Sequence, residues 1–243
     1  MPPLLSIIIP AHNEEQRLPD SLSKIMSFLH DQSYEAEILV VNNGSQDRTA
    51  EIVREFQTNH SNLFLINEER AGKGLAVRLG MLRASGEYLF ICDADLSMPI
   101  QEIRKFIPPT LVDFDIAIGS REVPGAVRYN EPAHRHWIGR IFNFFVRTLA
   151  VSGFMDTQCG FKCFHETAGR DLFQVQRLDG WTFDVEVLFI AQRRGYRIVE
   201  VPIQWYYFPA SRIHVLRDSL HMFMDLFKIR LNWMKDLYAS RVD

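Results

Sequence analysis

Residues 88–95 read Tyr-Leu-Phe-Ile-Cys-Asp-Ala-Asp, and this stretch is the strongest indication of the fold class. Its continuous apolar part, residues 88–92, is typical of a strand that is buried on both faces of a sheet. Asp93 and Asp95 follow directly at the exit of that strand. Two carboxylates so close repel each other unless they stay solvated or share a cation, such as Mg²⁺ or Mn²⁺. The spacing alone leaves a second interpretation open, in which Asp95 caps a following helix and Asp93 lies in a wet turn.

Similar apolar runs occur before and after this stretch, and they alternate with amphipathic helical patterns. We expect further strands at residues 5–9, 37–41, 63–66 and 115–119. The alternation predicts an α/β domain with a mostly parallel sheet that is covered by helices on both faces. Ligands of such sheets bind beyond the carboxyl ends of the strands. Polar clusters stand at these predicted ends, at residues 10–14, 42–43, 93–95 and 119–121, so a ligand site is the better account of the two aspartates.

The composition limits the function classes that the chain can serve. With 243 residues, 47% apolar and 23% charged, it can bury a large core, as one large domain or as one domain with a long appendage. A net charge of −3 gives no electrostatic reason to expect nucleic-acid binding. Three cysteines and a strand that starts directly after the first residues predict a reducing, cytosolic setting. No run reaches the roughly 18 apolar residues that a spanning helix needs.

The second half contains two amphipathic stretches, residues 128–155 and 214–238. Their apolar positions recur at helical spacing, with arginines and lysines beside them. The first stripe is Ile138, Phe142, Phe145 and Leu149, and the second is Leu216, Leu220, Phe223, Phe227, Leu231, Met234 and Tyr238, widened by Met222, Leu226, Ile229 and Trp233. Core packing is one interpretation, and helices that lie in the plane of a membrane surface are the favoured one. We expect a catalytic domain at residues 1–210 and a membrane-contacting helix at 211–243.

Three short motifs have weaker functional interpretations. Gly72-Lys73-Gly74 lacks the spacing of a phosphate loop and of a dinucleotide fingerprint, although Lys73 at a helix start suits a diphosphate. Cys159, Cys163 and His165 have a spacing that suits a short strand, so structural cysteines are favoured over a zinc site. No Gly-x-Ser-x-Gly elbow supports a serine hydrolase.

Taken together, the motifs resemble glycosyltransferase family 2, with its GT-A fold. The first-half resemblance rests on residues 9–15 (Ile-Pro-Ala-His-Asn-Glu-Glu), 41–45 (Val-Asn-Asn-Gly-Ser), 93–95 and 119–121 (Gly-Ser-Arg). Residues 156–162 (Asp-Thr-Gln-Cys-Gly-Phe-Lys) and 181–186 (Trp-Thr-Phe-Asp-Val-Glu) resemble the dolichyl-phosphate β-glucosyltransferase branch and its polyprenyl-phosphate relatives. The resemblance covers roughly residues 5–210.

The resemblance implies roles for particular residues. Asp93, Ala94 and Asp95 match the positions that hold the metal, Mg²⁺ or Mn²⁺, and the donor. The nucleotide side of the site is implied for Pro10, His12, Glu14, Asn42, Asn43 and Lys73. Arg121 and Arg135 match arginines that face the acceptor phosphate, and Asp156, Gln158 and Asp184 match positions near the sugar or the acceptor. Asp95, Arg121 and Asp184 are the implied catalytic side chains.

Two departures from the family pattern bear on the donor. The family often has Tyr at the position of His12 and two aspartates at Asn42-Asn43. An amide offers one acceptor and one donor, which suits the uracil edge, whereas a carboxylate accepts two hydrogens from guanine. We therefore expect a UDP-sugar, with glucose favoured, and a polyprenyl or dolichyl phosphate acceptor at the cytosolic face of a membrane.

Four other functions remain as alternatives at this point. They are a GDP-mannose-dependent polyprenyl-phosphate mannosyltransferase, a soluble family 2 enzyme that acts on a glycan, a nucleotidyltransferase, and a non-catalytic nucleotide-binding module. The last two fit less well, because the 156–162 signature argues against a nucleotidyltransferase, and Asp93, Asp95 and Arg121 argue against a module without activity.

Overall fold

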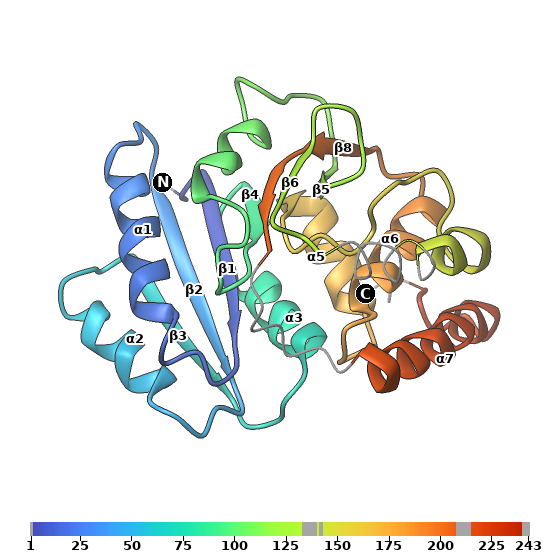
Figure 1. Ribbon diagram of the computed structural model, residues 1–243, viewed down its shortest axis with the longest axis horizontal. Helices are drawn as coiled ribbons and strands as arrows, with labels where there is room; N and C mark the ends of the chain where they lie inside the picture. The colour runs from blue at the N-terminus through green and yellow to red at the C-terminus, as the bar shows by residue number, and fades with distance from the viewer. Residues whose placement is uncertain (1, 133–139, 141–142, 208–214, 240–243) are drawn as a thin grey trace.

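The computed structural model describes residues 2–132, 140, 143–207 and 215–239, and it describes the side chains of the last segment from residue 221 onward. A seven-stranded sheet in the order β3-β2-β1-β4-β7-β5-β8 forms its centre (Figure 1). The strands are β1 (Leu5–Ala11), β2 (Ala36–Asn43), β3 (Leu63–Glu68), β4 (Tyr88–Ile91), β5 (Ile116–Ser120), β7 (Lys162–His165) and β8 (Ile198–Pro202). The expected α/β fold with a mostly parallel sheet is confirmed.

One strand runs against the rest. β7 pairs antiparallel with both β4 and β5, while the other neighbours in the sheet are parallel. β7 therefore begins at the edge where the parallel strands end. The turn before it, residues 156–161, is anchored by Phe161, whose ring meets those of Phe90 and Phe106 edge-on at 5.0 and 6.3 Å between centroids. Such pairs contribute about 0.5–1.5 kcal/mol beyond their buried area, so they fix this turn at the sheet edge.

Helices cover both faces of the sheet, as the alternation predicts (Figure 1). Successive residues of a strand point to opposite faces, so Ile7 and Ile9 join one core and Ile8 joins the other. The first core lies under α1 (Leu18–His30), α2 (Thr49–Gln57) and the 3-10 helix η1 (Ile100–Lys105). The second lies under α3 (Lys73–Arg83), α5 (Glu166–Val175), α6 (Phe183–Arg193) and α7 (Val215–Met234).

The strand expected to run from Tyr196 to Ile203 and on into Gln204-Trp205 is divided in two. β8 ends at Pro202, which has no N–H to donate to the ladder. The chain then forms β9 (Gln204–Tyr206), which pairs in a separate two-stranded sheet with β6 (Val127–Tyr129). The helix expected from Trp181 likewise begins two residues later, at Phe183.

The last helix has two apolar faces rather than one. Met222, Leu226 and Ile229, which widen the expected stripe, are the buried residues. The expected stripe itself is exposed at Phe227, Leu231 and Met234. Residues 143–149 form a helix in which Val146 is buried and Phe145 of the first stripe is exposed, while Ile138 and Phe142 lie outside the described residues. In the described part of the chain, no helix has the length and apolarity to cross a bilayer.

Candidate active site

The polar clusters meet at one edge of the sheet. β1 ends at Ala11, β2 at Asn43, β4 at Ile91 and β5 at Ser120, and their parallel pairing sets these ends on the same side. His12, Asp93 and Arg121 follow directly or nearly so. The antiparallel β7 adds the turn at 156–161 and the side chain of Lys162 to this edge. We call this set of groups the carboxyl rim.

The loop after β1 is fastened to the loop after β2. His12 Nδ1 donates to the Asn43 carbonyl oxygen at 2.5 Å, and the Asn13 amide N–H donates to Ser45 Oγ at 2.9 Å. The Glu14 amide N–H donates to Thr49 Oγ1 at 2.8 Å. Asn13 adopts a left-handed backbone with φ 53°, a conformation that asparagine tolerates better than most residues. These bonds hold one side of the rim in shape before any ligand binds.

Two amide oxygens at the end of β2 are buried without a partner among the described residues, Asn42 Oδ1 and Asn43 Oδ1. The Asn42 amide nitrogen donates to Asn67 Oδ1 at 3.0 Å, and the Asn43 residue is 3% exposed. A buried acceptor without a donor costs about 1–3 kcal/mol, so such atoms favour a ligand that supplies an N–H group. Asn43 also lies beside His12, whose Nδ1 donates to its carbonyl oxygen.

Asp93 forms an ion pair with a lysine. Lys73 Nζ lies 2.6 Å from Asp93 Oδ1, and the two side chains are 16% and 27% exposed. The same ammonium lies 5.3 Å from the centre of the Trp181 ring. Burial alone favours loss of the proton, but the negative charges of Asp93, Asp184 and Asp95 outweigh it and raise the pKa of Lys73. Lys73 is thus an ammonium that is paired with Asp93 and stabilised further by the negative charges of Asp184 and Asp95.

Asp93 is positioned by a glycine in the turn before β7. A Cβ atom on Gly160 would lie 1.8 Å from Asp93 Oδ2, so this carboxylate rests against the bare backbone of residue 160. Asp95 has a different environment, because its Oδ1 accepts bonds from the Ser97 amide N–H at 2.9 Å and from Ser97 Oγ at 2.8 Å. Asp95 therefore closes the turn that follows β4 and does not cap a helix, since the next helix, η1, begins at Ile100 after Pro99, while Asp93 lies against the Lys73 ammonium.

The donor atoms at the rim fit Mg²⁺ or Mn²⁺ only when a substrate completes the site. Among the described residues, no three His, Cys, Asp or Glu side chains cluster as a metal site. Asp93 and Asp95 offer hard oxygen ligands, and the Lys73 ammonium beside Asp93 shows that this position attracts a cation. Mg²⁺ is usually bound in this manner, through one or two carboxylates together with substrate phosphates and water.

Asp184, near the start of α6, forms a buried ion pair with Lys162. Its Oδ1 lies 2.8 Å from Lys162 Nζ, and the two side chains are 8% and 2% exposed. Lys162 also donates to the Cys159 carbonyl oxygen. Burial raises the pKa of Asp184, although Lys162 and Lys73 act against this shift. Asp184 is thus paired with Lys162 and also feels the charge of Lys73, the lysine that pairs with Asp93.

Arg121 is held by a buried carboxylate. Its Nε and Nη2 donate to the two Asp156 oxygens at 2.6 and 2.9 Å, and its guanidinium lies 5.4 Å from the centre of the Trp205 ring. Glu200 accepts from the Asp156 amide N–H at 3.0 Å, which fixes the backbone of this acid. Although burial acts in the other direction, Arg121 lowers the pKa of Asp156 to about 2. Asp156 in turn raises the pKa of Arg121 despite burial.

Three other predicted site residues have simpler positions. Pro10 lies within β1, and the carbonyl oxygen of Ala94 accepts from Ser21 Oγ at 2.7 Å. The Glu14 carboxylate accepts from Arg17 Nε and Nη2 at 2.7 and 2.9 Å. Arg135, the second predicted phosphate-binding arginine, lies outside the described residues.

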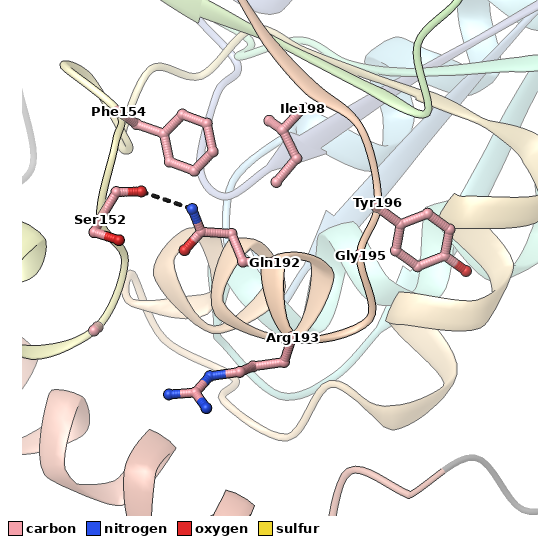
Figure 2. A pocket seen from close by; sticks show the side chains of 8 residues that line it. Ser152, Phe154, Gln192, Arg193, Gly195, Tyr196 and Ile198 are labelled. Carbon is pink, nitrogen blue, oxygen red and sulfur yellow. Dashed lines mark hydrogen bonds between the residues drawn. The ribbon is translucent and has the colours of Figure 1, made fainter.

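A cavity of about 550 Å³ lies elsewhere on the molecule (Figure 2). Its described lining includes Ser152, Gln192, Arg193 and Tyr196, and the Gln192 amide donates to the Ser152 carbonyl oxygen at 2.6 Å. Ile198, the first residue of β8, also lines it, so the cavity is at the end of the sheet opposite the carboxyl rim. The ionisable groups that define the rim are not among this lining, and we place the site at the rim.

The structure adds residues that the sequence argument did not assign to the site, Gly160, Lys162 and Trp181. All three belong to the two second-half motifs, but their roles depend on contacts with Asp93, Asp184 and Lys73 from other elements. Gly74, the second residue of α3, has a packing role. A Cβ there would lie 2.3 Å from the Leu178 carbonyl oxygen, so its absence lets α3 pack against the loop that carries Trp181.

Comparison with proteins of known sequence gives a consistent result. Residues 6–171 match the family Glycosyl transferase family 2. Dolichyl-phosphate beta-glucosyltransferase ALG5D of Trichomonas vaginalis is 34% identical over 254 residues, covering 98% of this chain and 76% of the relative. The Dolichyl-phosphate beta-glucosyltransferase of Drosophila melanogaster is 36% identical, covering 97% of this chain and 76% of its own length.

Comparison with solved structures agrees on the fold. Glucosyl-3-phosphoglycerate synthase from Mycobacterium tuberculosis, in complex with Mn²⁺, UDP-glucose and phosphoglyceric acid, aligns with a TM-score of 0.66 at 15% identity. The alignment covers 95% of this chain and 79% of that one. The Mg²⁺ and UDP complex of the same enzyme aligns at 0.63 and 18% identity. The expected GT-A fold is confirmed, and the chain belongs to glycosyltransferase family 2 as a sugar-transferring enzyme.

Proposed function

We propose that this enzyme transfers glucose from UDP-glucose to a dolichyl or other polyprenyl phosphate, with inversion at the anomeric carbon. The observation that carries the proposal is the pair of ion pairs at the carboxyl rim, Lys73 with Asp93 and Lys162 with Asp184. The support for the substrates is that relatives named dolichyl-phosphate beta-glucosyltransferase align over 97–98% of this chain.

The base and ribose of the donor belong beside β1 and β2 in this proposal. Pro10, His12 and Glu14 would form one wall, and the partnerless amide oxygen of Asn43 offers an acceptor for an N–H group of the base. A single amide offers one acceptor and one donor, which suits the adjacent donor and acceptor of uracil. Calorimetry with UDP and GDP tests this assignment, and tighter binding of GDP would contradict it.

The diphosphate belongs between Asp93, Asp95 and the start of α3. When bound, Mg²⁺ or Mn²⁺ supplies Lewis-acid stabilisation of the charge that develops on the leaving diphosphate. Asp93, Ala94 and Asp95 would hold it together with the donor. Lys73 at the first turn of α3 adds a positive charge where a helix N-terminus already favours anions. These charges lower the energy of the departing UDP without a proton donor.

The acceptor needs orientation more than activation. A phosphate monoester has a second pKa of about 6, so most of it is dianionic at neutral pH and is itself the nucleophile. Nε and Nη2 of Arg121 donate to Asp156, so Nη1 is the nitrogen that would donate to the acceptor phosphate. Arg135 is the second proposed contact of this phosphate. Asp184 would orient a sugar hydroxyl. Direct attack on an α-linked donor gives a β-linked product.

In this proposal the lipid part of the acceptor lies against an exposed apolar face that is formed by the 143–149 helix and α7. Phe145 in the 143–149 helix meets Phe223 of α7 edge-on at 5.6 Å, and Phe223 meets Phe227 at 5.2 Å. Further exposed apolar side chains continue this face: Phe144, Met224, Leu231 and Met234. Exposed basic residues, including Arg147, Lys228, Arg230 and Lys235, accompany it and suit anionic lipid. In this proposal residues 1–210 catalyse and residues 211–243 rest on the cytosolic face of a membrane.

Transfer from a panel of UDP- and GDP-sugars to a short polyprenyl phosphate, with Mg²⁺ or Mn²⁺, tests the reaction. UDP-glucose should be the best donor, and transfer should stop when the metal is chelated. Asp95→Ala should abolish transfer while the circular dichroism spectrum stays that of the wild type. Activity with a glycan acceptor but none with the lipid phosphate would refute the proposed acceptor.

Sedimentation with vesicles that contain anionic lipid tests the membrane surface. Replacing Phe227 and Leu231 by serine should release most of the protein from the vesicles. Phe64→Ser is a matched control, since Phe64 is 45% exposed and Phe227 48%, but Phe64 lies on β3 at the far edge of the sheet. Equal loss of sedimentation in the control would argue against a defined membrane face.

A further inference from the structure

We propose that Lys73 is an exchangeable counter-cation, which occupies Asp93 in the free enzyme and gives that carboxylate up to the divalent metal when the nucleotide diphosphate binds. The inference rests on the proposed function, because it presumes that metal and diphosphate meet at the carboxyl rim. It assigns to this chain a coupling between its two ligands that runs through one side chain.

The contact itself is the first observation. Lys73 Nζ is 2.6 Å from Asp93 Oδ1, which is the ionised group expected to ligate the metal. An ammonium and a divalent ion on the same carboxylate repel each other strongly at such short range, most of all where burial limits screening. Metal binding to the free enzyme must therefore displace Lys73 from Asp93.

The second observation is that Asp93 has little freedom to turn away from Lys73. Its other oxygen, Oδ2, rests against Gly160, where even a methyl group would overlap it. The Trp181 ring lies 5.3 Å from the lysine ammonium and keeps it on this side of the rim. Exchange of the cation is thus a movement of the flexible lysine rather than of the carboxylate.

The third observation is the position of Lys73 at the start of α3, beside the place proposed for the diphosphate. Lys73 is the first residue of α3, so its side chain starts at a helix N-terminus, where free N–H groups and the helix dipole favour an anion. A bound diphosphate gives the lysine a new negatively charged partner within reach of its own stem. Diphosphate binding then frees Asp93, and the metal binds to a carboxylate that has lost its competitor.

The exchange predicts a reciprocal coupling. UDP raises the affinity for the metal partly because it removes Lys73 from Asp93, and the metal raises the affinity for UDP by the same factor. In a Lys73→Met variant this part of the coupling disappears. Metal alone then binds more tightly than to the wild type, while UDP alone binds more weakly. A lysine that only contacts phosphate would change the second affinity and leave the first unchanged.

Binding of Mn²⁺, followed by electron paramagnetic resonance with and without UDP, tests the exchange without any turnover. For a partly buried ion pair we expect Lys73→Met to tighten Mn²⁺ binding to the free enzyme by about tenfold. The same variant should shrink the UDP-induced gain in Mn²⁺ affinity by a similar factor. Lys73→Arg keeps the charge and should keep the weak Mn²⁺ binding of the wild type.

Lys24→Met is the matched control, because Lys24 is also 2.6 Å from an aspartate, Asp20, but on the exposed surface of α1. It should leave both affinities unchanged. Unchanged or weaker Mn²⁺ binding to free Lys73→Met enzyme overturns the exchange while the proposed function stands. A wild type that binds neither Mn²⁺ nor UDP overturns the proposed function, and the exchange with it.

Discussion

Replacing Gly160 by alanine tests whether Asp93 is the group that organises the site. A Cβ at this position would lie 1.8 Å from Asp93 Oδ2 and 2.5 Å from its Cγ. Backbone strain does not enter, because the φ of Gly160 lies outside the left-handed region. The added methyl group acts only by displacing the carboxylate, which must shift by about 1.6 Å, from 1.8 to 3.4 Å, to restore an ordinary van der Waals contact.

The expected loss is large for activity and small for stability. A displacement of about 1 Å at a reacting centre costs on the order of a hundredfold in rate, so kcat/KM for transfer should fall by about that factor. Overpacking typically costs about 1–3 kcal/mol, and the lower end applies because the Asp93 side chain is 27% exposed, so the added methyl group pushes on a partly solvated group at the rim rather than on the closed core. Mn²⁺ affinity should fall together with the rate of transfer.

The measurements are transfer from UDP-glucose to a short polyprenyl phosphate, Mn²⁺ binding, and urea denaturation. Gly180→Ala is the control, since no atom lies within 4 Å of its added Cβ and it is in the loop beside Trp181. It should keep the activity of the wild type. A Gly160→Ala enzyme with normal transfer and normal Mn²⁺ affinity would refute the role that we give to Asp93.

Three further predictions concern buried charges. Asp156→Asn should lower the free energy of unfolding in urea by about 3 kcal/mol, because it leaves the Arg121 guanidinium, which is only 23% exposed, without its counter-charge. Folding lowers the pKa of Asp156 from 3.8 to about 2, so the stabilisation from its ion pair is complete above pH 3.8 and disappears as the pH falls through 2. The difference in melting temperature between the wild type and Asp156→Asn should therefore shrink over that pH window. A difference that stays constant would contradict the ion pair. Tyr238→Phe removes the hydroxyl that donates to the buried Glu186 at 2.6 Å and should cost about 1–3 kcal/mol in the same urea assay, whereas an unchanged midpoint would mean that water replaces the hydroxyl.

Local patterns predicted most of the sheet because its strands are buried on both faces. Runs such as residues 88–92 have few alternatives to a central strand, and the parallel alternation then fixes which chain ends share an edge. The burial pattern of the second half of the chain is harder to predict from its sequence. Whether Phe227 or Leu226 of α7 is buried depends on how the helix is rotated against α6, and a helix that is apolar on two faces does not reveal this rotation in its sequence.

The candidate site shows the same difference between what local patterns predict and what only contacts between distant residues establish. Local patterns predict that Asp93, Asp95, His12 and Asn43 stand at strand ends, and parallel strands bring their carboxyl ends to one edge, so a shared rim follows from the sequence. The partners of the charged groups follow from tertiary contacts instead: Lys73 with Asp93, Lys162 with Asp184, and Asp156 with Arg121. Each pair joins residues from different elements, at least 20 positions apart in the chain, and several basic side chains were compatible with each acid. The choice among them is made by the packing of α3, β7 and α6 around Asp93, a long-range effect that no local pattern of residues encodes.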